Sequence, residues 1–144
     1  MLLAAALMWA LHRWLPVGQL IATPWNYFAV IPVVVGRAIT VAAGTRFRQA
    51  RTTFDILKPR EASSLVTAGV FRISRNPMYL GSLLLLIGWA LWLGTVSPWL
   101  VPPLFMIFIS VTQIIPEEQA LEEIFGETYL AYRNSVRRWI GRYA

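Results

Sequence analysis

Two long apolar runs that follow each other directly set the strongest limit on how this chain can fold. Residues 78–93 and 99–115 contain no charged side chain, and the connection from Gly94 to Pro98 is an uncharged turn. A bilayer is crossed by about 17 to 25 apolar residues, or fewer where the lipid thins or flanking residues snorkel. The pair therefore predicts a membrane-spanning helical hairpin, because the amphipathic pattern of a soluble helix is missing.

Two further apolar stretches precede this hairpin. Residues 1–15 are a short candidate span, and residues 24–44 are a longer one that contains Arg37, which we interpret as a snorkelling anchor near the inner end. Across the 144 residues, 57% are hydrophobic and 14% are charged. We predict an all-α integral membrane protein with about four transmembrane helices, folded as a single domain over residues 1–144.

The basic residues gather in two polar segments, a loop at 45–77 and the tail after 132. Because cytoplasmic segments are rich in Lys and Arg, both should be cytoplasmic, which four spans with both termini inside satisfy. We therefore expect a multi-pass protein of a bacterial or archaeal cytoplasmic membrane, with no nucleic-acid partner. The chain has no cysteine and one histidine, so we expect no metal site. The eleven basic residues are Arg46, Arg48, Arg51, Lys58, Arg60, Arg72, Arg75, Arg133, Arg137, Arg138 and Arg142.

The loop at 45–77 should be structured. Residues 65–71 predict a short strand or extended segment with a turn at Gly69, and Pro77 should be the first helical residue of the third span. Asn76 would then either cap that helix or meet a ligand. An alternative is that Arg75 is only a lipid headgroup anchor and Tyr79 only an interfacial aromatic.

The tail begins with an acidic pair. Pro116 should open a helix with Glu117 and Glu118 in its first turn, where the helix dipole favours negative charge. Capping alone would explain the pair, but acids beside anionic headgroups also need a cationic partner. Apolar residues then recur every three or four positions, which predicts amphipathic helices over residues 116–140 with a break at Gly126. These helices could be an interfacial anchor or could cover a cofactor.

Taken together, these segments resemble the membrane methyltransferase family that includes isoprenylcysteine carboxyl methyltransferases and phospholipid methyltransferases. The resemblance covers roughly residues 44–140 and implies methyl transfer from S-adenosylmethionine, bound at the cytoplasmic face in a pocket that is not a Rossmann fold. The absence of a glycine-rich loop between a strand and a helix agrees with this. The matching segments are Leu65-Val66-Thr67-Ala68-Gly69-Val70-Phe71, Arg75-Asn76-Pro77-Met78-Tyr79-Leu80-Gly81, Glu117-Glu118-x-x-Leu121, Phe125-Gly126-x-x-Tyr129-x-x-Tyr132 and Arg138-Trp139-Ile140.

The resemblance also implies roles by position. Glu117 would bind the ammonium of the cofactor's methionine moiety, and Arg133 and Arg137 are candidates, by proximity only, for tuning the acceptor. Many prenylcysteine enzymes have His at the position of Asn76, and Arg, placed for the substrate, at the position of Gln113. The second difference argues against a prenylcysteine carboxylate as acceptor. The remaining cofactor-lining positions would be Ser64, Leu65, Val66, Phe71, Asn76, Pro77, Met78 and Tyr79.

Three functional hypotheses follow. The preferred one is an S-adenosylmethionine-dependent methyltransferase whose acceptor enters from the lipid bilayer; a phospholipid amine, an isoprenoid acid, or a small apolar amine or thiol would fit. The second is a membrane reductase of the sterol or steroid reductase type that uses NADPH. The third is a non-enzymatic membrane scaffold, in which the polar motifs are only helix caps and anchors.

Overall fold

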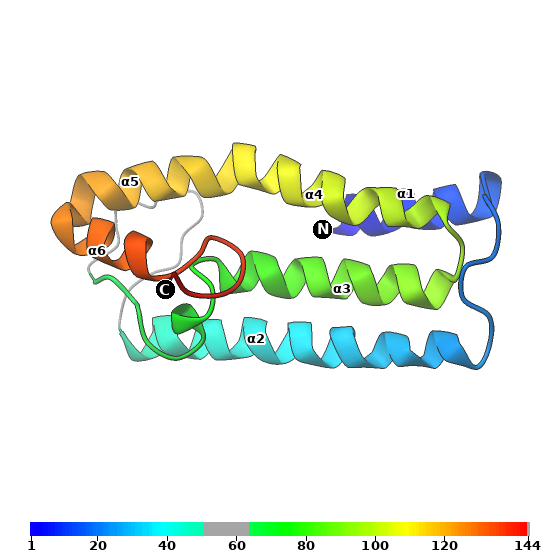
Figure 1. The fold of residues 1–144 in the computed structure, drawn as a ribbon, viewed down its shortest axis with the longest axis horizontal. Helices are drawn as coiled ribbons and strands as arrows, with labels where there is room; N and C mark the ends of the chain where they lie inside the picture. Colours follow the sequence, from blue (N-terminus) through cyan, green and yellow to red (C-terminus); the bar gives the residue numbers. More distant parts are fainter. Residues whose placement is uncertain (51–63, 144) are drawn as a thin grey trace. The chain divides into compact units, whose positions relative to one another are not determined.

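The computed structural model describes residues 1–50 and 64–143, and this part of the chain is mostly helical (Figure 1). Extended pairing in it is limited to two isolated bridges, Gln19 with Thr95 and Val136 with Arg142, so the all-α prediction is confirmed for these residues. The α-helices are α1 (Leu2–Trp14), α2 (Val30–Gln49), α3 (Pro77–Leu93), α4 (Val101–Ile109), α5 (Ile115–Phe125) and α6 (Glu127–Ser135). Shorter helical turns are η1 (Trp25–Ala29), η3 (Gly69–Arg72), η4 (Ser97–Leu100) and the π-helix η5 (Ser110–Ile114).

Two helical runs in the described residues are long and apolar enough to cross a membrane. One comprises η1 and α2, Trp25–Gln49, and the other extends from η4 through α5, Ser97–Phe125. Helix α3 is apolar but shorter, and its 17 residues extend about 25 Å at 1.5 Å per residue. Large side chains on α4 face outward, with Phe108 63% exposed, as suits a surface in contact with lipid. The arrangement of four spans stays a prediction.

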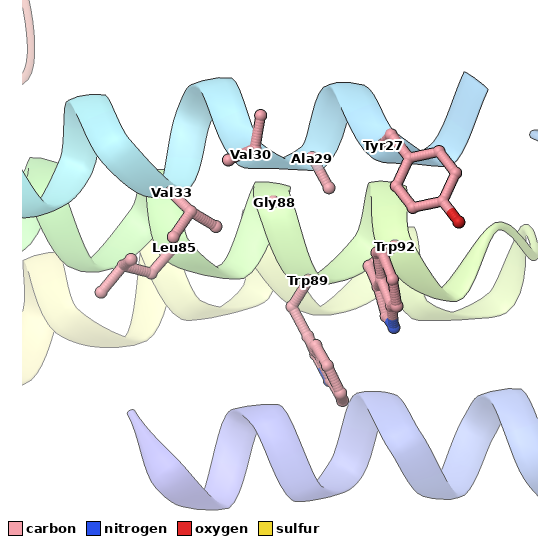
Figure 2. Close-up of a pocket in the computed structure, with 8 residues that line it drawn as sticks. All are labelled: Tyr27, Ala29, Val30, Val33, Leu85, Gly88, Trp89 and Trp92. Atoms are coloured by element: carbon pink, nitrogen blue, oxygen red, sulfur yellow. The ribbon is translucent and has the colours of Figure 1, made fainter. Parts of the chain in front are cut away.

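The chain divides into two compact units, and the first comprises Met1–Ala38 and Gly81–Phe108. Its helices α2 and α3 pack closely because glycines lie at the contact: a Cβ on Gly36 would come within 2.7 Å of the carbonyl oxygen of Gly81. Trp89 Nε1 donates a hydrogen bond of 3.2 Å to the carbonyl of Ala5, which links α3 to α1. A pocket of about 430 Å³ also lies in this unit and is lined by Tyr27, Ala29, Val30, Val33, Leu85, Gly88, Trp89 and Trp92 (Figure 2).

The second unit comprises Ile39–Leu80 and Ile109–Ala144. Two sequence signals in it are confirmed, because Pro77 is the first residue of α3 and Gly126, with φ +49°, separates α5 from α6. Proline suits a first helical position, where its missing N–H would have no partner. A positive φ is also a conformation that glycine adopts without the steric strain of a Cβ.

Three boundaries differ from the prediction. Helix α2 continues to Gln49, so the predicted loop start at 45 is wrong, while the membrane boundary near 44 stays a prediction. The helix ends with the basic side chains of Arg46 and Arg48, which its dipole favours there. Pro116 lies in the first turn of α5 but opens no separate helix, since α5 continues directly from η5. A π-helical segment before the proline offers a wider turn, which can accommodate its lost hydrogen bond.

The third difference concerns the end of the chain. Helix α6 ends at Ser135, so the amphipathic helices predicted over 116–140 stop earlier. Residues 136–143, which we call the strap, leave the helix at Val136 and fold back on themselves through the bridge between Val136 and Arg142. Their backbone bonds reach distant residues, as described below, and this tertiary pairing outweighs the local helical periodicity.

Candidate functional site

A hydrogen bond between Tyr79 and Glu117 joins the two polar motifs that the sequence singled out. The Tyr79 hydroxyl donates to Oε1 of Glu117 at 2.5 Å across a separation of 38 residues. Tyr79 is buried in the first turn of α3, and Glu117 is half-buried in the first turn of α5. Within the described residues, the hydrogen bond from Tyr79 is the side-chain contact of Glu117, and it involves one of the two carboxylate oxygens. The phenol thus orients the carboxylate without neutralising it.

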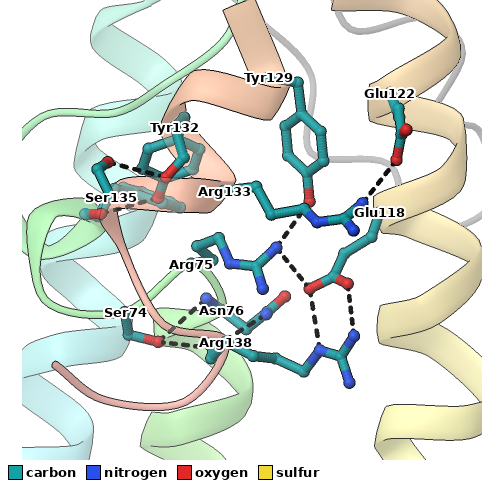
Figure 3. Close-up of polar contacts among 11 residues, drawn as sticks. Ser74, Arg75, Asn76, Glu118, Glu122, Tyr129, Tyr132, Arg133, Ser135 and Arg138 are labelled. Atoms are coloured by element: carbon teal, nitrogen blue, oxygen red, sulfur yellow. Dashed lines mark hydrogen bonds and ion pairs between the residues drawn. The ribbon is translucent and has the colours of Figure 1, made fainter. Parts of the chain in front are cut away.

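The neighbouring acid, Glu118, is bound by two arginines (Figure 3). Arg75 Nη1 lies 2.9 Å from Oε1, and Arg138 donates from Nε at 3.0 Å and from Nη2 at 2.7 Å to the two carboxylate oxygens. The side chains of Arg75 and Glu118 are only 7% and 11% exposed, whereas Arg138 is 37% exposed. The predicted need for a cationic partner is therefore met at Glu118, while Glu117 contacts a phenol instead.

Two tyrosines of α6 attach that helix to the loop before α3. Arg75 Nη1 donates to the Tyr129 hydroxyl at 3.2 Å, and the Tyr132 hydroxyl donates to the carbonyl of Phe71 at 2.8 Å. Burial raises the pKa of Tyr129, and the negative charge of Glu118 raises it further; burial likewise raises the pKa of Tyr132. Both phenols therefore stay protonated around neutral pH, so Tyr132 keeps its hydrogen bond to Phe71.

The strap lies against the residues just before α3. Asn76 Nδ2 donates to the carbonyl of Arg138 at 3.1 Å, and Ser74 Oγ donates to the same oxygen at 3.3 Å. Two backbone bonds add to these, from the Gly141 N–H to Ile73 and from the Arg75 N–H to Arg137. Asn76 was predicted to cap α3 or to meet a ligand, and the structure adds a contact with the strap that the sequence did not suggest.

Gly69 begins the turn that leads into this region. Its φ of +66° confirms the predicted turn. Of the two forms predicted for residues 65–71, the strand is not formed, whereas Ala68 is extended and is followed by the 3-10 helix η3. The ring of Phe71 packs edge-on against Phe47 of α2 at 5.2 Å, and its carbonyl is held by Tyr132. These contacts fix the segment without a neighbouring strand in the described part of the chain.

We expect Gly69→Ala to destabilise the protein by about 1–2 kcal/mol, because an L side chain is strained at this φ. A Cβ there would also come within 2.7 Å of Nε of Arg46. The matched control is Gly44→Ala in α2, where a Cβ would meet nothing within 4 Å; it should stabilise by about 0.5–1 kcal/mol. Thermal unfolding of the detergent-purified variants measures both changes in stability. Equal changes in the unfolding temperature of the two variants would contradict the assignment of the turn to Gly69.

The remaining predicted site residues lie in different surroundings. Ser64 Oγ donates to the carbonyl of Ala50 at 3.4 Å, and Gln113 is half-buried in η5. Arg133 pairs with Glu122 at 2.8 Å on an exposed surface, and the Arg137 guanidinium lies 5.3 Å from the centre of the Tyr143 ring. The roles assigned to these residues stay predictions. Of the other cofactor-lining candidates, Pro77 and Phe71 are buried and Leu65, Val66 and Met78 are half-buried.

Sequence reasoning missed the cluster formed by Arg75, Glu118, Tyr129 and Arg138. Each of these residues was present in the segments that carry the family resemblance, but none was assigned a site role. The available signal was the acidic pair itself, whose need for positive charge was recognised. The two arginines that bind Glu118 lie 43 and 20 residues away from it in the chain, so the local sequence could not identify them.

Comparisons with known proteins agree with the resemblance. A family model described as phospholipid methyltransferase matches residues 25–128, which include Tyr79, Glu117 and Glu118. An uncharacterized protein of Haemophilus influenzae is 46% identical over 63 residues, which are 44% of this chain and the whole of that protein. Protein-S-isoprenylcysteine O-methyltransferase A of Arabidopsis thaliana is 34% identical over 111 residues, 76% of this chain and 55% of that protein, so the chain spans about half of this relative. No solved structure matches the chain significantly.

Proposed function

The chain belongs to the phospholipid methyltransferase family, and from this premise we propose that it transfers a methyl group from S-adenosylmethionine to a lipophilic or amphipathic acceptor at the cytoplasmic face of a membrane. The observation that carries the proposal is the hydrogen bond from Tyr79 to Glu117. It brings the Asn76-to-Tyr79 segment into contact with the acidic pair. These are the two segments that the family resemblance assigns to the cofactor.

The residues around this bond fit the polar end of the cofactor. One oxygen of Glu117 accepts from Tyr79, and among the described residues the other has no recorded contact and could accept from an ammonium group. Because the carboxylate is half-buried, such an ion pair would be screened less than one on the open surface. We propose that the backbone around Leu65 binds the adenine edge, and that the pocket is completed by Ser64, Val66, Phe71, Asn76, Pro77 and Met78.

The proposed chemistry asks the protein mainly to position the reactants. S-adenosylmethionine supplies the methyl group together with a good leaving group, because its sulfonium is positively charged. Tyr79 would hold Glu117 in the orientation that binds the ammonium, and α5, α6 and the strap would exclude water. We also propose that Gln113 faces the acceptor and that Arg133 or Arg137 tunes its reactivity; position alone supports these three roles.

We propose further that the chain forms one membrane domain over residues 1–144, with four spans near residues 1–15, 24–44, 78–93 and 99–115. Both termini would lie in the cytoplasm, on the same side as the site. Two helical runs long enough to cross a bilayer and the two basic polar segments support this arrangement. The acceptor, which could be a phospholipid amine, an isoprenoid acid or a small apolar amine or thiol, would enter laterally from the lipid.

Isothermal titration of the detergent-purified protein with S-adenosylhomocysteine, with NADPH titrated in parallel, tests the proposal. We expect saturable binding of S-adenosylhomocysteine and no binding of NADPH. Binding of NADPH alone would overturn the proposal in favour of a reductase. Binding of neither, by a protein that still unfolds cooperatively, would favour the non-enzymatic scaffold.

A further inference from the structure

Most contacts of the strap with residues 73–76 and Glu118 are polar. Apolar burial in the strap is confined to Val136, which is buried, and Trp139, which is half-buried, whereas Ile140 is 63% exposed and Tyr143 is 52% exposed. The contacts that remain are the backbone bonds to Ile73 and Arg75, the bonds that Ser74 and Asn76 donate to Arg138, and the ion pair of Arg138 with Glu118. Segments with few buried apolar contacts open most readily.

One residue links the strap to the proposed cofactor pocket. Asn76 lies next to Pro77 at the start of α3, and its side-chain amide donates to the strap at the carbonyl of Arg138. The same residue, Arg138, carries the guanidinium that binds Glu118 with two hydrogen bonds. The docked strap therefore contacts both the Asn76 side chain and Glu118 through the same residue.

We propose that Glu118 and Arg138 form a latch that keeps the strap docked against residues 73–76, and that this docking slows release of S-adenosylhomocysteine. The inference rests on the proposed function. It divides the acidic pair between two tasks: Glu117 binds the cofactor, and Glu118 is a positioning residue that acts through the strap. The two carboxylates can do this because neighbouring residues on a helix point about 100° apart.

Arg138→Gln is the suitable variant for a test. Arg138 is 37% exposed, and Glu118 keeps its ion pair with the buried Arg75 when Arg138 is replaced. Arg138→Lys retains the positive charge but loses the planar fork that makes two hydrogen bonds, so it should rescue the latch only in part. Arg142→Gln is the matched control, since it removes the same charge from an exposed side chain of the strap itself.

The test combines hydrogen–deuterium exchange of the strap with the dissociation rate of S-adenosylhomocysteine from the full chain in detergent. In Arg138→Gln we expect faster exchange at the amides of Arg137, Gly141 and Tyr143, which are hydrogen-bonded in the docked strap. We also expect dissociation to be about tenfold faster, the lower end of what losing hydrogen bonds to a charged group costs. Arg138→Lys should fall between this variant and the wild type, and Arg142→Gln should match the wild type.

Two results would overturn the latch while leaving the proposed function intact. Unchanged exchange in Arg138→Gln would show that the ion pair does not hold the strap. Faster exchange with an unchanged dissociation rate would show that the strap does not control release. A wild-type protein that binds no S-adenosylhomocysteine would overturn the control of release together with the proposed function, and a flat titration distinguishes this from the other two results.

Discussion

Glu117→Gln is expected to remove measurable binding of S-adenosylhomocysteine while the protein stays folded. Glutamine has nearly the same shape and can still accept from the Tyr79 hydroxyl, but it carries no charge for the ammonium. Removing one member of a desolvated charged pair costs about 2–5 kcal/mol, and the lower figure already corresponds to about 30-fold in affinity. Isothermal titration gives the affinity, and thermal unfolding establishes that the variant is folded.

Two further variants test whether the loss of affinity comes from the charge of Glu117 at this site, and not from a general change in charge or from the orientation of the side chain. Glu127→Gln removes the same charge from the exposed first turn of α6 and should leave the affinity unchanged. Tyr79→Phe keeps the ring but removes the hydroxyl that orients Glu117, so we expect a smaller loss of affinity, about fivefold to tenfold. Wild-type affinity in a folded Glu117→Gln protein would exclude Glu117 from the cofactor site.

Some boundaries of the fold could be predicted because the residues that determine them act locally. Pro77 starts α3 because a proline lacks the N–H that the helix interior needs, and Gly126 separates α5 from α6 through a positive φ. The end of α2 was predicted too early for the opposite reason. The change from apolar to basic residues near Gly44 was read as the end of the helix, but it marks only a change in the surroundings of a helix that continues to Gln49.

The strap could not be predicted from periodicity. Val136 and Ile140 continue the spacing of apolar residues in α6, so a local pattern favours more helix. The chain leaves the helix there, and its backbone pairs with Ile73 and Arg75, more than sixty residues away. Such pairing depends on where the distant segment lies, which only the tertiary structure supplies.

The contacts of the acidic pair illustrate the same difference at the site. The sequence indicated that two acids beside a membrane need partners, and it singled out Tyr79 and Glu117 through the family resemblance. Which acid meets the phenol and which meets the arginines depends on the rotation of α5 about its own axis, since one residue changes the direction by about 100°. In the structure Tyr79 contacts Glu117, and the two arginines contact Glu118.

We expect Glu118→Gln to have the largest effect on stability, a loss of about 3–5 kcal/mol. This is the range observed when one partner of a buried ion pair is removed and the other charge stays buried. Arg75 would be left 7% exposed without its counter-ion, and the nearby guanidinium of Arg138 would then repel it. Nε of Arg75 already lacks a partner among the described residues, so the site has little means of compensating. Thermal and denaturant unfolding in detergent measure the loss.

Burial of the pair is the cause of this effect, and two comparisons test that cause. Glu122→Gln removes a carboxylate of the same helix from an ion pair in which the side chains of Arg133 and Glu122 are 45% and 42% exposed, so its effect should stay within about 1 kcal/mol. Replacing both buried partners, as Glu118→Gln with Arg75→Met, leaves no unpaired buried charge and should recover part of the lost stability, although it also removes the hydrogen bond from Arg75 to the Tyr129 hydroxyl. If Glu118→Gln and Glu122→Gln destabilise the protein equally, the Glu118 cluster does not stabilise the fold as a buried ion pair.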